Sequence, residues 1–264
     1  MFGERRAVIA AGGAAAGNQR AATLVLALGP VGDIVARMYQ LESGMAGLRR
    51  LPGPLALCLG SLAVAQPAAA PGLNATTPVF SQLVMFTLPA EFRSAQPTYE
   101  KNSGSFYIRE QVPEGETLGK WSRMITLSGA RGLAGNGNAT PQAMLARMSA
   151  DFQRNCPESF ASAAPGAQKV DGYDAYEVIV SCGRVGSDKG AYGESAVMLT
   201  LKGTNDYYTL QWTERGRDSS GPPRIDVAYW NAQLARLSPI RLCPIVPGEA
   251  APYHSCAARQ DAAR

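Results

Sequence analysis

Strand-like segments joined by very short turns constrain the fold of this 264-residue chain more than any other feature. The dipeptide Asp171-Gly172 is typical of a tight hairpin and separates two such segments. Residues 203–206 likewise separate 195–202 from 207–214, and both of these segments alternate in the manner of strands with one buried face. Because turns this short connect antiparallel neighbours, the pattern predicts a mainly antiparallel sheet.

Two helices are expected among the strands. Thr140 suits the N-cap of a helix that begins at Pro141, and Pro222 and Pro223 precede a second helix that Pro239 ends. Both helices carry apolar side chains at spacings of three and four, namely Met144, Leu145, Met148 and Phe152 in the first and Val227, Trp230, Leu234 and Leu237 in the second. Further strands are expected at 79–88, 105–112, 121–127, 168–170 and 173–182. The order of strands, helix, strands and helix predicts an α+β fold in which helices pack against the sheet.

Residues 45–65 have the three parts of a secretory leader that begins at an internal methionine. A pair of arginines is followed by an apolar stretch at 55–64 and by small residues that end at Ala65. The apolar stretch is about ten residues long, against the roughly 20 needed to cross a bilayer. We therefore predict cleavage after Ala65 and no stable membrane insertion of the mature protein. Lipid attachment at Cys58 is the alternative, but that processing needs a small residue where this chain has Leu57.

The leader divides the chain into segments with different expected roles. Residues 1–44 are expected not to be part of the native protein, and 66–78 form a flexible lead-in. A single domain follows over 79–243, and a disulfide ties down the tail at 244–264. Residues 1–65 hold six of the 25 Lys and Arg residues but three of the 21 Asp and Glu residues, so the mature protein carries a net charge of +1 instead of +4. Nucleic-acid binding, which needs a strongly basic surface, is therefore not expected.

Four cysteines follow the leader, and an even number in an exported protein argues for two disulfides. Of the three possible pairings we favour Cys156 with Cys182, which ties the end of a helix to the end of a strand, and Cys243 with Cys256, which closes a short tail loop. Cys243 and Cys256 could instead bind a metal together with His254. Thiolates in an oxidising compartment more often pair with each other, so disulfides are expected.

The sequence contains no complete catalytic, nucleotide-binding or metal-binding motif, and no cofactor is expected. The aromatic side chains of Tyr207, Tyr208 and Trp212 are candidates for lining a ligand groove, with the alternative that strand alternation places half of them in the core. An enzyme whose carboxylates act without a readable motif is a further alternative. Such a site would be recognised by a concave pocket that holds carboxylates of raised pKa.

Two groups of residues resemble a known family. Pro113-Glu114-Gly115-Glu116 is followed by Trp121 and Met124-Ile125-Thr126, and Trp230 is followed by Leu234, Leu237, Pro239 and Cys243. In these features residues 79–243 resemble small exported proteobacterial proteins with the PsbP and DcrB-like α/β/α sandwich. The resemblance implies an antiparallel sheet between helices that serves binding or assembly in the cell envelope, although a fold by itself does not establish function.

The sequence therefore predicts a periplasmic or secreted protein that binds a protein partner or a small ligand without catalysing a reaction. An envelope hydrolase and a metal-handling protein are the alternatives.

Overall fold

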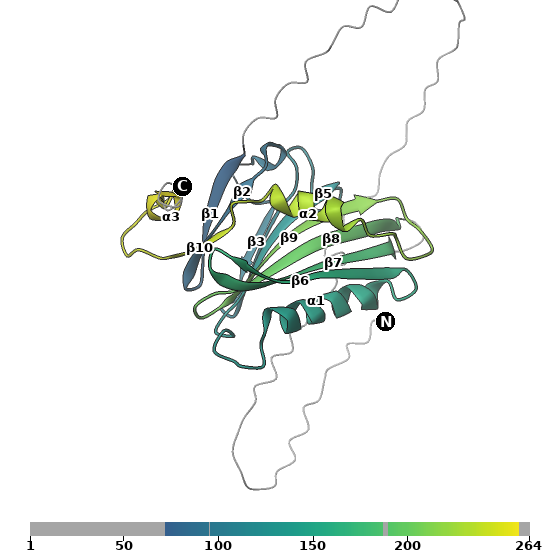
Figure 1. Cartoon of the computed structure of the whole chain (residues 1–264). Coiled ribbons are helices and arrows are strands. Elements are labelled where there is room, and N and C mark those ends of the chain that lie inside the picture. The colour runs from purple at the N-terminus through teal and green to yellow at the C-terminus, as the bar shows by residue number, and fades with distance from the viewer. Residues whose placement is uncertain (1–71, 95, 187–189, 259–264) are drawn as a thin grey trace, which may run out of the picture.

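Two antiparallel sheets form the framework of the computed structural model, which describes residues 72–94, 96–186 and 190–258 (Figure 1). The large sheet has seven strands in the spatial order β3 (Tyr99–Asn102), β4 (Phe106–Gln111), β5 (Arg123–Ala130), β9 (Tyr207–Gly216), β8 (Tyr192–Lys202), β7 (Tyr173–Val185) and β6 (Phe160–Val170). The small sheet has three strands in the order β1 (Leu73–Val79), β2 (Gln82–Leu88) and β10 (Arg241–Pro244). Neighbouring strands in both sheets run antiparallel, so the mixed α+β class is confirmed. The predicted leader 45–65 and the upstream segment 1–44 lie outside the described residues.

The helices within the described ranges are the short 3-10 helix η1 (Ala90–Phe92), α1 (Pro141–Asn155), α2 (Val227–Ala235) and the short α3 (His254–Ala258). The predicted N-cap is confirmed, because the Thr140 hydroxyl accepts a hydrogen bond of 3.0 Å from the backbone N–H of Ala143. Asp226 caps α2 in the same way, accepting from the backbone N–H of Tyr229 at 3.1 Å. None of the helices in the described ranges is both long and apolar enough to cross a bilayer.

The two predicted hairpins are confirmed as β6–β7 and β8–β9. Of the strand expected at 79–88, the part from Gln82 to Leu88 is confirmed as β2, but the strand does not start at Val79. The chain turns at Phe80 and Ser81, and β1 and β2 on either side pair with each other from Leu73 opposite Leu88 to Val79 opposite Gln82. The small sheet therefore includes residues 73–78, which were expected to belong to a flexible lead-in. Pro78 is compatible with β1 because this strand lies at the edge of the small sheet, where a missing N–H costs no ladder bond.

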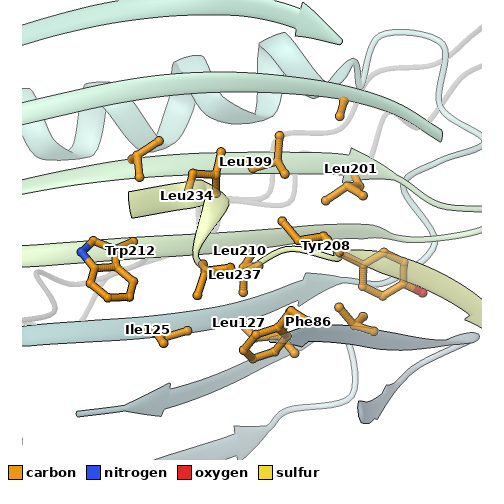
Figure 2. Close-up of a cluster of buried hydrophobic side chains, with 14 of the residues drawn as sticks. Phe86, Ile125, Leu127, Leu199, Leu201, Tyr208, Leu210, Trp212, Leu234 and Leu237 are labelled. Carbon is orange, nitrogen blue, oxygen red and sulfur yellow. The ribbon is translucent and has the colours of Figure 1, made fainter. Parts of the chain in front are cut away.

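Alternating side chains divide the large sheet into two faces. On one face α1 packs over β6, β7 and β8, where the fully buried Leu145 contacts a cluster made of Val178, Val180, Ala196 and Met198. We call this the α1 face. The opposite face, the α2 face, carries the main core and is covered by α2 and by the small sheet. Figure 2 shows Leu234 and Leu237 lying over the strands that carry Leu199, Leu210 and Trp212.

A buried carboxylate holds the small sheet against the large one. Asp206, in the turn between β8 and β9, accepts hydrogen bonds from the backbone N–H of Ser81 at 3.0 Å, the Ser81 hydroxyl at 2.5 Å and the Tyr208 hydroxyl at 3.2 Å. The backbone N–H of Gly132 donates a fourth bond of 2.7 Å. Burial alone would raise the pKa of Asp206, but these donors stabilise the charged form and hold its pKa below the usual value. The β1–β2 hairpin is thus fixed at one end of the α2 face.

Candidate functional site

The three aromatic residues that the sequence offered as ligand contacts are buried. Tyr207, Tyr208 and Trp212 are 1%, 0% and 0% exposed, and Tyr207 points to the α1 face while the other two belong to the core of the α2 face. The Tyr208 hydroxyl bonds to Asp206, and the Trp212 indole N–H donates to Glu214 at 2.8 Å. The structure therefore does not bring these three side chains together in one groove, and contact with a ligand would require the core to open.

The predicted disulfide pairing is confirmed. Cys156 pairs with Cys182 and Cys243 pairs with Cys256, at Cα–Cα distances of 5.7 and 5.6 Å. The second pair removes both thiolates from the metal site that was considered with His254. Among the residues that the structure describes, no three His, Cys, Asp or Glu side chains are grouped to hold a metal ion.

An apolar cleft lies between the small sheet and the outer strands of the large sheet. It has a volume of about 10 Å³, which is room for about one water molecule. Its lining consists of Ala75, Phe86, Leu88, Arg109, Gln111, Ile125 and Leu127. We call it the interlayer cleft. Figure 2 shows Phe86 of β2 packed beside Leu127 of β5. Both residues are among those that line the cleft.

The two polar residues of the interlayer cleft come from the same strand. In β4, Arg109 lies opposite Leu127 and Gln111 lies opposite Ile125, so strand alternation directs both side chains to the α2 face. Sequence analysis did not identify these residues, because an alternating strand with polar side chains normally indicates a face turned to solvent. The small sheet covers this face, and that packing is a tertiary feature that the strand itself does not encode.

Gln111 is buried with one polar atom unused. The residue is 3% exposed, its amide nitrogen donates to the carbonyl oxygen of Gln96 at 3.3 Å, and its Oε1 atom has no hydrogen-bond partner in the protein. The Gln96 carbonyl fixes which end of the amide is the nitrogen, so the unused atom is an acceptor. A buried acceptor without a donor costs about 1–3 kcal/mol. Less than 1 Å² of Oε1 is exposed, so a molecule would reach this acceptor only where the cleft opens.

Arg109 supplies positive charge to the same cleft. Its guanidinium is half-buried and donates to the Thr77 hydroxyl of β1 at 3.3 Å. In the parts of the chain that the structure describes, the ion pairs found do not include Arg109. Glu100 lies opposite Arg109 in the strand register, but it is exposed and accepts a bond of 2.5 Å from the Tyr107 hydroxyl. The cleft thus combines a cation without a carboxylate partner, a free acceptor and apolar walls.

A second group of residues lies on the α1 face, and two of them, Tyr192 and Glu194, come from β8, one of the strands that α1 packs over. The Arg215 guanidinium is stacked between the rings of Trp121 and Tyr192, at 4.0 and 4.1 Å from their centroids. Burial raises the pKa of the neighbouring Glu194 to about 7, against the opposing influence of Arg215, and burial also raises the pKa of Glu110. We call these five residues the Glu194 cluster. A carboxyl group that titrates near neutral pH can act as a general acid or base.

Comparison with known proteins does not assign the chain to a family. No family model and no curated protein matches the sequence. Among solved structures, the chain is similar to LpqN, which is described as involved in cell envelope biogenesis of Mycobacterium tuberculosis, with 11% sequence identity and a TM-score of 0.27. The alignment covers 67% of this chain and 88% of LpqN. At that TM-score the likeness does not establish a shared fold.

Proposed function

We propose that this chain is an exported, disulfide-bonded protein that binds a small ligand without chemical conversion, in an interlayer cleft that opens to admit it. The unused acceptor of the buried Gln111, placed in an apolar cleft, is the observation that carries the proposal. Small-molecule sites combine mainly apolar walls with a few placed polar groups, and this cleft has that composition. Its polar groups are a guanidinium and an amide, which suit recognition and supply neither a nucleophile nor a base.

Export to the periplasm or the medium is supported by the leader-like segment 45–65 and by the two disulfides. It is tested by N-terminal sequencing of native protein and by counting its free thiols. We expect a first residue of Gln66 and no free thiol. A protein that keeps its leader and is reduced inside the cell would contradict export.

Membership of the PsbP and DcrB-like family is part of the proposal. The large sheet with one helix on each face supports it, while the small sheet that shares the α2 face is an addition to a simple three-layer sandwich. A solved structure of a family member that superimposes over both faces of the large sheet would test the assignment.

Binding in the cleft is tested by nuclear magnetic resonance of the mature protein with a panel of small amphiphilic compounds. We expect shifted amide signals to map to β1, β2, β4 and β5. Ala75→Phe should abolish binding because the ring fills the cleft. Ala146→Phe introduces the same ring at an exposed position of α1 and should leave binding unchanged. Circular dichroism establishes that both variants fold, and binding that survives in Ala75→Phe would overturn the proposal.

A second candidate function is an envelope hydrolase that uses the Glu194 cluster, and the raised pKa of Glu194 supports it. The mature protein would be assayed against ester, peptide and glycan substrates. Turnover that is lost in Glu194→Gln and kept in Glu158→Gln, an exposed glutamate after α1, would favour the enzyme. Absence of turnover with all three classes would count against it.

A further inference from the structure

We propose that Asn136 is a site of spontaneous modification, where the side-chain amide is converted through a cyclic succinimide into aspartate and isoaspartate. The inference goes beyond ligand binding and does not depend on it. Asn136-Gly137 is the only Asn-Gly pair in the sequence and lies in the loop between β5 and α1. Three features of this loop carry the inference: an unhindered nucleophile, an activated amide and exposure of both to water.

The reaction needs only water and the groups of the loop. The backbone nitrogen of Gly137 attacks Cγ of Asn136, and the new N–C bond closes a five-membered ring. The bond between Cγ and the side-chain nitrogen then breaks, and that nitrogen leaves as ammonia with the proton that the Gly137 nitrogen has lost. Water next adds to a carbonyl of the ring and opens it without any oxidation or reduction. Opening at one carbonyl gives aspartate, and opening at the other gives isoaspartate, in which the backbone runs through the former side chain.

The nucleophile is the backbone nitrogen of Gly137, which is exposed and unhindered. A Cβ atom added to Gly137 would meet no atom within 4 Å beyond its chain neighbours. Among the described residues, none accepts a hydrogen bond from its backbone N–H. A side chain on the residue that follows an asparagine hinders ring closure, and glycine has none and moves its backbone most freely. The Gly137 nitrogen is therefore free to reach Cγ of Asn136.

The amide that is attacked is activated by the turn itself. The backbone N–H of Asn138 donates to Oδ1 of Asn136 at 3.0 Å. When the Gly137 nitrogen attacks Cγ, negative charge develops on this oxygen, and a donor that is already in place stabilises it. Asn136 is exposed, so water reaches the amide and the ring that follows from it.

Asn102 provides a comparison within the same chain. Its Oδ1 atom accepts a hydrogen bond of 2.9 Å from the backbone N–H two residues on, that of Gly104, and the residue is exposed. The residue directly after it is Ser103, whose side chain hinders the attack. Asn102 thus has the activated oxygen without the unhindered nucleophile, whereas Asn136 has both.

The modification would change a loop that packs beside α1. Leu133, Ala134 and Ala139 of this loop belong to one cluster with the buried Tyr207. The backbone carbonyl of Asn136 accepts from the N–H of Ala139 at 3.0 Å. In isoaspartate this carbonyl becomes part of a free carboxylate and an extra methylene enters the backbone, so the turn loses its geometry. We expect faster amide exchange over 132–140 and unchanged exchange in β7 and β8.

Incubation of the mature protein at pH 8, followed by peptide mass spectrometry over time, tests the proposal. The peptide with Asn136 should gain the mass of deamidation severalfold faster than the peptide with Asn102, and isoaspartate should be among its products. Both products add a negative charge, so anion exchange separates the modified protein for the measurement of amide exchange.

Three variants test the assigned contacts, and circular dichroism establishes that each folds. Gly137→Ala should slow the modification about fivefold or more, because the nucleophile loses the freedom of glycine. Asn138→Pro removes the N–H donor and should slow it about fivefold. Asn138→Ala keeps the donor and should leave the rate unchanged.

Other outcomes would overturn the proposal or one of its steps. An Asn136 peptide that keeps its mass, or that changes no faster than the Asn102 peptide, would overturn it as a whole. Aspartate without isoaspartate would indicate direct hydrolysis of the side chain and exclude the cyclic route. Equal rates in Asn138→Pro and Asn138→Ala would remove the activating role of the turn, and unchanged amide exchange in the isolated isoaspartate form would refute the expected effect on the loop.

Discussion

Asp206 shows at the scale of one residue how the two sheets are held together. Replacing it by alanine leaves the backbone N–H groups of Ser81 and Gly132 and the Tyr208 hydroxyl without their acceptor. We expect Asp206→Ala to lower the free energy of unfolding at pH 7 by about 3 kcal/mol. Urea denaturation measures the change, and Asp218→Ala in the exposed loop after β9 is the matched control, expected within about 0.5 kcal/mol of wild type.

The pH dependence of this effect has a definite sign. Because the pKa of Asp206 is lowered in the folded protein, its contribution is fully present above 3.8, the ordinary pKa of an aspartate. The contribution is lost as pH falls through the lower folded-state pKa. The difference between wild type and Asp206→Ala should therefore be constant from pH 7 to pH 5 and shrink below pH 4. A difference that stays constant across this acidic range would contradict the assigned role of the charge.

Glu194 should show the opposite dependence. Its folded-state pKa of about 7 lies above 4.5, the ordinary pKa of a glutamate, so ionisation opposes folding and stability falls as pH rises from 4.5 through 7. We expect Glu194→Gln to be about 2 kcal/mol more stable than wild type at pH 8 and nearly equal to it at pH 4, after allowance for partial solvent screening. Urea denaturation at both pH values measures this. A variant whose stability relative to wild type is the same at both would refute it.

At the scale of the element, the β6–β7 hairpin depends on one glycine. Gly172 has a φ of 83°, and a Cβ atom added there meets no other atom within 4 Å. Gly172→Ala therefore tests backbone conformation alone and should cost about 1–2 kcal/mol in the free energy of unfolding. Gly135→Ala is the control, because that glycine lies in equally open space without a positive φ. Equal stability of the two variants in thermal unfolding would show that the turn tolerates a side chain.

The elements that sequence analysis predicted correctly are those with local signals. Thr140 and Pro141 mark the start of α1, and Asp171-Gly172 marks the turn of a hairpin, so a few neighbouring residues suffice for each. The strand β1 has no such signal, because its sequence LNATTPV is polar and contains a proline, and it is a strand because β2 lies beside it. The short strands β3 and β10 were missed for the same reason: their pairing partners are supplied by other parts of the chain.

At the scale of the whole molecule, the candidate site could not be predicted because it arises from packing. The cleft brings Ala75 of β1 and Phe86 of β2 against Arg109 and Gln111 of β4, and the contact depends on how the small sheet is placed on the large one. The aromatic residues were prominent in the sequence for a different reason. Tyr208 and Trp212 are fully buried, and burying such large side chains stabilises the core. The polar groups of the cleft, Arg109 and Gln111, are ordinary side chains that become distinctive only when the small sheet covers them.

Both disulfide pairings were predicted. One is expected to stabilise the whole domain and the other only the tail. Cys156–Cys182 closes a loop with a sequence separation of 26 and ties α1 to β7 beneath the α1 face, whereas Cys243–Cys256 spans a separation of 13 and fastens α3 to β10. From loop closure alone we expect Cys156→Ala/Cys182→Ala to cost about 3.5 kcal/mol and Cys243→Ala/Cys256→Ala about 3 kcal/mol. Loss of Cys156–Cys182 should appear as less stable global unfolding, with a Tm lower by roughly 7–14 °C.

Loss of Cys243–Cys256 should appear mainly as faster hydrogen exchange in the tail after β10, because the large sheet keeps its strands without α3. Calorimetry and amide exchange on the two double variants separate these responses, and a tail that stays protected from exchange without Cys243–Cys256 would contradict the local role of that bond.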